Sequence, residues 1–141
     1  MDETKSSSAS AGDSEGRVRV YARGRVEMRS STARLVESNS LKKGDVLTAA
    51  RFAGVQAAKA APQYLALLSG MRPLEVSVDF VIGENDVGVR VGVGGHDSLE
   101  IAMLALTSTT VTCLTIFDMC KSADRTMAIG PVHLEHAPRT S

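Results

Sequence analysis

Three stretches of the chain alternate between apolar and polar residues, the pattern of a strand with one face in water. In residues 17–28, small apolar residues take every second position with arginines between them, and Gly24 is expected to interrupt the strand. Residues 74–82 and 86–93 alternate in the same way. The three residues between them, 83–85, contain glycine and asparagine and suit a hairpin turn.

Helix signals fill the gaps between these strands. The stretch 30–37 suits a short helix, and the alanine-rich stretch 46–60 suits a longer one with Asp45 as its N-cap and Pro62 as its stop. Alanines and a glycine on this second helix leave a narrow side, which lets another backbone approach closely. Residues 98–121 predict a third helix, with an acidic or hydroxyl cap immediately before or at its start.

The last expected strand, residues 127–134, contains Pro131, which places it at an edge or kinks it. The element order is then strand, short helix, helix, strand, strand, helix, strand. Two βαβ crossovers around a hairpin predict an α/β (α+β) fold of the ferredoxin-like type, a βαββαβ split sheet with the helices on one face. Residues 1–16 are predicted to be a disordered tail before a single domain, 17–136, and 137–141 a second tail.

Composition limits the partners. Sixteen basic and sixteen acidic residues cancel, so only a local cluster could hold an anion, and neither nucleic acid nor a membrane is an expected partner. The segment 101–117 is uncharged but carries five threonines and a serine, which favours a buried helix of a soluble protein over a membrane span. The N-terminus has no hydrophobic signal core. These features predict a cytoplasmic protein.

The two cysteines and three histidines suggest no metal site. Cys113 and Cys120 lie seven residues apart on one predicted helix, about 10 Å along its axis, so they are expected to be reduced core thiols. His96, His133 and His136 have no metal-ligand spacing, and no resident metal is expected.

Charge without an evident packing role gathers at two places. Asp118 and Lys121 follow the uncharged segment of the third helix, one turn apart and on one face. Lys43, beside Lys42 and followed by Gly44, stands just before the second helix, where backbone N–H groups and a lysine could form a phosphate-binding corner. A helix-end ion pair and solvated lysines are the alternative readings, and the residues alone leave both open.

Two further features are read as structural. Arg51 interrupts an otherwise apolar helix, and its stem is expected to lie along apolar neighbours while its charge stays in water. The GVGG segment, 92–95, lacks the order of a dinucleotide-binding loop and is expected to be a flexible turn between strand and helix.

Several blocks of the sequence resemble one known family. These are MRSSTARLV (28–36), KKGDVLTAARFAGVQAAK (42–59), LTIFDMCK (114–121) and IGPV (129–132). In this order they are similar to the signature blocks of cyclic pyranopterin monophosphate synthase, the MoaC family of molybdenum cofactor biosynthesis. The similarity extends over roughly residues 25–134 without gaps between the blocks.

The resemblance implies a fold, an assembly and a reaction. Family members are ferredoxin-like and form hexamers built from dimers, with active sites at subunit contacts. They convert 3′,8-cyclo-7,8-dihydroguanosine 5′-triphosphate into cyclic pyranopterin monophosphate and pyrophosphate. By resemblance, Asp118 performs acid–base chemistry with Lys121 beside it, Lys43 stabilises phosphate charge, and Met103 contacts substrate. No resident cofactor is implied, although magnesium could accompany the triphosphate.

Four positions depart from the family pattern. Ser69 stands where members carry a histidine, Ala102 and Leu104 where they carry two glutamates around a methionine, and Ala137 where they carry a C-terminal lysine. Losing one acid–base group typically lowers a rate by about 10²- to 10⁴-fold. Two hypotheses follow: a synthase-type lyase, or a catalytically inactive paralogue that binds or assembles. A third hypothesis, unrelated to the family, is a ferredoxin-like module that binds small ligands or RNA. RNA binding is disfavoured because the first strand offers Tyr21 alone for base stacking.

Overall fold

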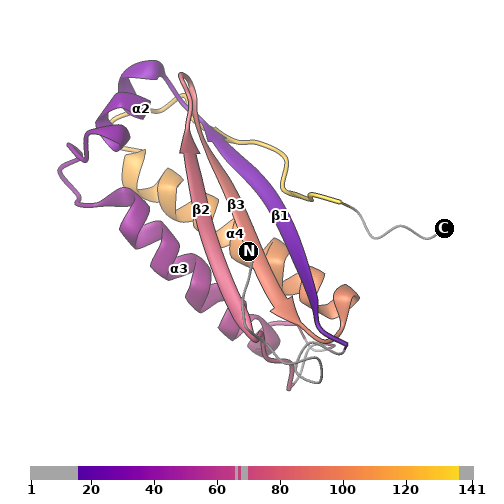
Figure 1. The fold of residues 1–141 in the computed structure, drawn as a ribbon. Coiled ribbons are helices and arrows are strands. Elements are labelled where there is room, and N and C mark those ends of the chain that lie inside the picture. The colour runs from indigo at the N-terminus through magenta and orange to yellow at the C-terminus, as the bar shows by residue number, and fades with distance from the viewer. Residues whose placement is uncertain (1–15, 66, 68–69, 137–141) are drawn as a thin grey trace.

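The computed structural model of the protein describes residues 16–65, 67 and 70–136. Its strands form one antiparallel sheet in the order β2-β3-β1-β4, with β5 also paired to β1. Figure 1 shows β1, β2 and β3 as one layer with the long helices behind it. The strands are β1 (Val18–Glu27), β2 (Glu75–Ile82), β3 (Asp86–Gly95), β4 (Ala128–Ile129) and β5 (His133–Leu134).

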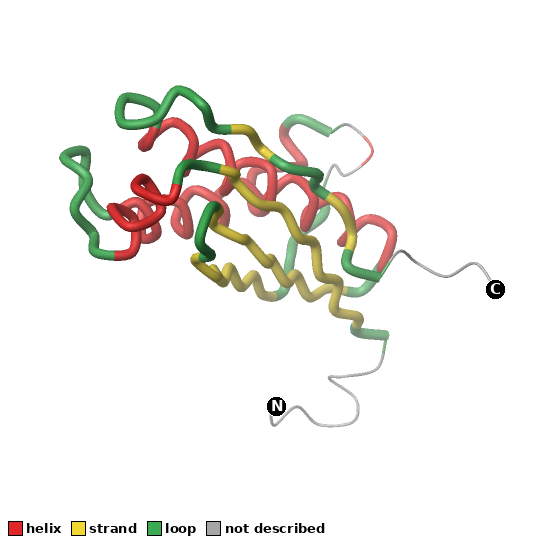
Figure 2. The backbone as a smooth tube through the Cα atoms, turned by 90° about the horizontal axis from the view of Figure 1, so that it is seen from above, coloured by secondary structure: helices red, strands yellow, loops and turns green. Residues whose placement is uncertain are grey.

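The helices are α2 (Ser30–Glu37), α3 (Val46–Ala60) and α4 (Ser98–Cys120), and the short 3₁₀ helix η1 (Ala61–Gln63) follows α3. Seen from above, the helices and the sheet form two layers (Figure 2). From β1 the chain passes through α2 and α3 to β2, which is separated from β1 in the sheet by β3. From β3 it passes through α4 to β4, which lies on the other side of β1. This confirms the predicted ferredoxin-like split sheet with helices on one face.

Strand β1 follows its predicted alternation. Ala22 and Val26 are buried against the helices, whereas the arginines between them are exposed on the other face. The expected interruption at Gly24 is wrong, because the strand pairs with β3 over its whole length. A Cβ at Gly24 would lie 3.1 Å from both Cys113 Sγ and Thr109 Cγ2 on α4. The glycine therefore serves close helix–sheet packing and not a bend.

The GVGG prediction is also wrong. Residues 92–95 are the buried end of β3 and pair with β1, up to Gly95 opposite Val18. The glycines leave room for neighbours: a Cβ at Gly92 would lie 2.7 Å from Tyr21 Cε1, and one at Gly95 would lie 2.1 Å from Ile101 Cδ1. Glycine hides the alternation that marks a strand, because it has no side chain to show which face it occupies.

The last predicted strand is divided into two. β4 pairs with β1 at Val26 and Glu27, and β5 pairs with it at Ala22 and Arg23. Pro131 lies between them, and proline has no N–H to donate to a ladder. The edge position expected from Pro131 is confirmed, because β4 and β5 pair with β1 alone, and the segment runs beside β1 (Figure 1).

The narrow side predicted for α3 is where it meets α4. A Cβ at Gly54 would lie 2.1 Å from Thr112 Oγ1, so only glycine permits this approach. The Ser108 hydroxyl donates to the Gly54 carbonyl oxygen at 2.7 Å. Thr109 and Thr112 are buried and donate to carbonyl oxygens one turn back on α4. Hydroxyl groups in the helix interface are thus paired, as burial requires.

Helix α4 is long and apolar enough to cross a membrane by length and composition, and in the described part of the chain no other helix is. It is a core helix here, because one side of it packs on β1, β3 and α3. The fully buried Ile101, Leu104 and Ile116 lie in the main hydrophobic cluster. This confirms the reading of the uncharged segment as a core helix.

Arg51 is exposed, as predicted, and its charged group also has partners on β2. Its Nε donates to the carbonyl oxygen of Val78 on β2 at 2.9 Å, and its guanidinium lies 5.2 Å from the ring centre of Phe80. β2 is an edge strand, so its outer carbonyl groups lack a strand partner. The guanidinium supplies a donor to that edge and is not simply solvated.

Candidate functional site

The C-terminal end of α4 presents an exposed ion pair. Lys121 Nζ donates to Asp118 Oδ1, and their side chains are 54% and 63% exposed. The hydrogen bond and charge of Lys121 hold the pKa of Asp118 below its ordinary value. Asp118 is therefore a carboxylate at neutral pH, ready to accept a proton or a hydrogen bond. Both groups keep most of their surface open to a ligand.

Lys43 lies close enough to this pair for its charge to lower the pKa of Asp118 as well. Lys43 is far from the pair in sequence, and it reaches the pair because α3 packs antiparallel along α4 (Figure 1). Within one chain, Lys43 thus lies within the range over which its charge acts on Asp118. We call these three residues the α4-end cluster.

The phosphate-binding corner before α3 has a different make-up from the one expected. Asp45 caps the helix, accepting from Thr48 N at 3.1 Å and from Thr48 Oγ1 at 2.7 Å. The Gly44 N–H donates to the Leu41 carbonyl oxygen at 3.2 Å. Two backbone amides of this corner already have acceptors, and the cap is itself an anion, so the lysine side chains are better suited than the helix start to hold a phosphate.

Met103 does not join the cluster. It lies fifteen residues before Asp118 on the same helix, which is about 22 Å along the axis. Its side chain is 40% exposed, whereas Ala102 and Leu104 on either side are buried. In one chain, a ligand at the α4-end cluster therefore cannot also touch Met103. Two other positions that depart from the family pattern, Ser69 and Ala137, lie outside the described residues.

A buried carboxylate that the sequence analysis missed lies just beyond the cluster. Asp124 accepts from Arg29 N at 2.8 Å and from Thr32 Oγ1 at 2.9 Å, both at the start of α2. It also accepts from Thr126 N and Thr126 Oγ1 at 2.8 and 2.6 Å. Burial by itself raises the pKa of Asp124, but these hydrogen bonds outweigh it and hold the pKa below its ordinary value. Without a periodic pattern around it, nothing local marked Asp124 as buried.

A second charged group lies on the helix-free face of the sheet. Glu135 accepts two hydrogen bonds from Arg90, both at 2.8 Å, and another from Arg23. The Arg90 guanidinium also lies 3.8 Å from the ring centre of Tyr21. The two arginines lower the pKa of Glu135 to about 2. We call Arg23, Arg90 and Glu135 the sheet clamp, because it holds the C-terminal segment against β1 and β3.

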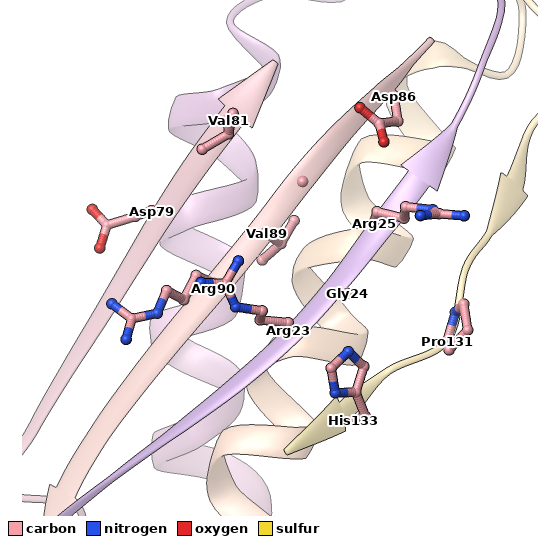
Figure 3. Close-up of a pocket in the computed structure, with 11 residues that line it drawn as sticks. Arg23, Gly24, Arg25, Asp79, Val81, Asp86, Val89, Arg90, Pro131 and His133 are labelled. Atoms are coloured by element: carbon pink, nitrogen blue, oxygen red, sulfur yellow. The ribbon is translucent and has the colours of Figure 1, made fainter. Parts of the chain in front are cut away.

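Next to the sheet clamp is an open hollow of about 480 Å³ (Figure 3). Asp79, Arg90 and Arg23 cross its floor on β2, β3 and β1, at paired positions of the sheet. Arg25 and Asp86 lie further along it. Three arginines and two aspartates line the hollow, so it has no strong net charge. It is separate from the α4-end cluster, none of whose residues line it.

The two cysteines are free and buried, as predicted. Burial raises the pKa of each thiol to about 11, so neither is a reactive thiolate near neutral pH. Among the described residues, no group of three or more histidine, cysteine or acidic side chains is placed to hold a metal ion.

Comparison with known proteins gives a consistent picture. A cyclic pyranopterin monophosphate synthase of Parvibaculum lavamentivorans is 40% identical over 117 residues, covering 80% of this chain and 72% of that protein. One of Desulforapulum autotrophicum is 36% identical over 138 residues, covering 87% and 85%. A molybdenum cofactor biosynthesis bifunctional protein of Chlorobaculum tepidum is 37% identical over 120 residues, or 85% of this chain but only 38% of that longer protein.

Among solved structures, 3-hydroxy-3-methylglutaryl-coenzyme A reductase of Streptococcus pneumoniae matches 83% of this chain and 28% of that one, with a TM-score of 0.47 at 11% identity. A likeness at that level carries no argument. The family model, in contrast, spans nearly the whole chain, residues 11–138. With that match and the synthases above, the chain belongs to the MoaC family, which serves molybdenum cofactor biosynthesis.

Proposed function

We propose that this protein works at the cyclic pyranopterin monophosphate synthase step, and that the α4-end cluster binds the phosphorylated substrate. The substrate would be 3′,8-cyclo-7,8-dihydroguanosine 5′-triphosphate, and the products cyclic pyranopterin monophosphate and pyrophosphate. The observation that supports this most directly is the meeting of Lys43 with Asp118 and Lys121 from distant parts of the sequence. An exposed acid flanked by two cations suits a ligand that combines phosphates with exchangeable protons.

Each residue has a role that its surroundings support. Lys43 and Lys121 would oppose the negative charge of the phosphates, including the charge that develops as pyrophosphate leaves. Asp118, whose pKa is lowered by Lys121, would be ionised at neutral pH and act first as a base that accepts a proton from the substrate. If magnesium accompanies the triphosphate, it would share the neutralising role of the lysines.

A contribution from Met103 requires a second copy of the chain, because Met103 is four turns away from Asp118. We therefore propose a homo-oligomer in which α4 of one protomer brings Met103 towards the cluster of another, and we expect dimers that assemble into a hexamer. The outer sides of α3 and α4 support this: Phe52, Leu99 and Leu114 are large, apolar and exposed. Light scattering coupled to size exclusion would report the assembly.

The test is turnover of the cyclised nucleotide, followed by pyrophosphate release and product fluorescence after oxidation. Asp118→Asn should lower the rate by about 10²- to 10⁴-fold, because the base is lost while the shape is kept. Lys43→Met should mainly raise KM, because it removes a binding charge. The exposed Glu37→Gln, which breaks a surface pair with Arg34, is the control. Unchanged rates in both cluster variants would contradict the proposal.

A second candidate, a catalytically inactive paralogue, is favoured by one observation. Ala102 and Leu104 are buried in the core, so they serve packing where family members carry glutamates. Ser69 and Ala137 would also lack the histidine and lysine of the family pattern. Binding of the cyclised nucleotide without turnover, with the affinity reduced by Lys43→Met, would support this candidate. Turnover by the purified protein would exclude it.

A further inference from the structure

Among the described residues, Asp124 is the one buried side chain that carries a charge at neutral pH. It follows Lys121 by three residues, in the turn where the chain leaves α4. That turn is closed by the Ala123 and Asp124 N–H groups, which donate to the Cys120 carbonyl oxygen at 2.9 and 3.2 Å. The carboxylate is thus fixed relative to the last turn of α4, which carries Asp118 and Lys121.

The hydrogen-bond partners of Asp124 come from two parts of the chain. Thr126 is two residues away, so its hydrogen bonds only shape the turn itself. Arg29 N and Thr32 Oγ1 belong to the start of α2, more than ninety residues away in sequence. Arg29 adds a bond from Nη2 to the Ala123 carbonyl oxygen at 2.8 Å. Asp124 therefore links the end of α4 to the start of α2 through a carboxylate that favourably meets the helix dipole.

From α2, hydrogen bonds continue towards Lys43. The Ser40 N–H donates to the Leu35 carbonyl oxygen at 2.8 Å, which ties the loop to the last turn of α2. Leu41 packs against the core, and its carbonyl oxygen accepts from Gly44 N. The hydrogen bond from Gly44 to Leu41 closes the turn that contains Lys43, and Gly44 allows it with φ +118°, a conformation that other residues rarely adopt.

We propose that Asp124 is a positioning residue that holds Lys43 and the Asp118–Lys121 pair in register, by fastening α2 to the end of α4. The inference rests on the proposed function, since the cluster it positions is the proposed substrate site. Asp124 itself is buried and does not contact the ligand. Its effect passes through α2 and the loop to Lys43.

The experiment measures how strongly Lys43 acts on Asp118. The pKa of Asp118 is read from its side-chain carboxyl carbon by NMR, with Lys43 and with Lys43→Met. The comparison is made in the unchanged chain, in Thr32→Val and in Thr126→Val. Both valine variants remove one hydroxyl bond to Asp124 at constant shape, but only Thr32→Val cuts the link to α2. Thermal melting records the loss of stability in each.

In the unchanged chain, Lys43→Met should raise the pKa of Asp118, because a neighbouring positive charge is removed. In the Thr32→Val background, the increase in the pKa of Asp118 should be less than about half of that in the unchanged chain. In the Thr126→Val background it should stay the same, even if both variants melt at a lower temperature. Asp124→Asn should reduce this increase in pKa the most. If Asp124→Asn does not fold, the comparison of Thr32→Val with Thr126→Val still tests the proposal.

Three results would overturn the proposal. An equal rise in all backgrounds would mean that Asp124 only stabilises the fold. An equal loss in both valine variants would mean that any loosening of the turn suffices, and no rise in the unchanged chain would mean that Lys43 does not act on Asp118. None of these needs turnover. A chain that shows the expected pattern but does not convert the cyclised nucleotide would refute the proposed function alone.

Discussion

The α4-end cluster and the sheet clamp both pair a carboxylate with cations, but the two carboxylates differ in exposure and in the number of their partners. Glu135 in the clamp is 15% exposed, and two arginines satisfy its oxygens. Asp118 in the cluster is 63% exposed and, among the described residues, has a single hydrogen-bonded partner, Lys121. The clamp fastens the C-terminal segment to the sheet. The Asp118–Lys121 hydrogen bond only joins two residues at the end of one helix.

This difference indicates which charged side chains are available to bind a ligand or take part in a reaction. A shielded carboxylate with every oxygen bonded contributes to folding and has no capacity left for a ligand. An exposed pair is screened by water and contributes little to stability, so its charges can be redirected to a phosphate at small cost. Burial and the number of partners, more than residue type, separate the structural charges of this protein from its candidate functional ones.

The comparison predicts that a buried carboxylate with no cation beside it destabilises the protein most. Leu104→Glu would restore a glutamate of the family pattern at a position that is 0% exposed. We expect it to lower the free energy of unfolding by roughly 3–5 kcal/mol, as buried unpaired charges do. Urea denaturation would measure this. Met103→Glu, at the next and 40% exposed position, is the matched control and should cost much less.

A Leu104→Glu protein as stable as Met103→Glu would contradict this reading of the helix. It would mean that position 104 faces a polar cavity and belongs to a site rather than to the core. The same result would also weaken the inactive-paralogue candidate, since the family glutamate would then be tolerated without repacking.

The sheet clamp should show an intermediate, pH-dependent effect. Folding lowers the pKa of Glu135 from 4.5 to about 2, so its stabilisation is present above pH 4.5 and is lost as the pH falls towards 2. Glu135→Gln should therefore cost on the order of 2 kcal/mol near neutral pH and almost nothing near pH 2. Urea midpoints across this range would test it. A pH-independent difference would show that packing, and not charge, holds the segment.

The exposed pair should show the smallest effect on stability. Asp118→Asn should leave the urea midpoint unchanged at neutral pH, because water replaces the hydrogen bond from Lys121. High salt should not alter that result. A clear loss of stability would place Asp118 with the structural charges and remove the main reason to regard the cluster as a binding site.

The sequence predicted most elements to within a few residues because their signals are local. α2 and α3 coincide with the predicted ranges, and Asp45 caps α3 as expected. The failures are at glycines: Gly24 and the segment 92–95 were taken as an interruption and a turn, but both belong to continuous strands. Which of these roles a glycine has depends on what packs against it, and that is information from elsewhere in the chain.

The charged residues of the site also fall into those that the sequence identified and those that it did not. The charge pattern and the motif resemblance both singled out Lys43, Asp118 and Lys121. The resemblance also grouped Met103 with them, although the helix keeps Met103 about 22 Å from Asp118. Asp124 and Glu135 went unnoticed, since an isolated acid looks the same in sequence whether it is solvated or buried.

By itself, then, the sequence determined the helix and strand ranges, the order of the elements and the family. Propensity, capping and periodicity act over a few residues and are written directly in the chain. Which charges are shielded, which glycines admit a neighbouring helix and which distant residues lie near the end of α4 depend on how the folded elements pack. Burial and pairing arise when segments from different parts of the chain pack together, and no local pattern encodes them.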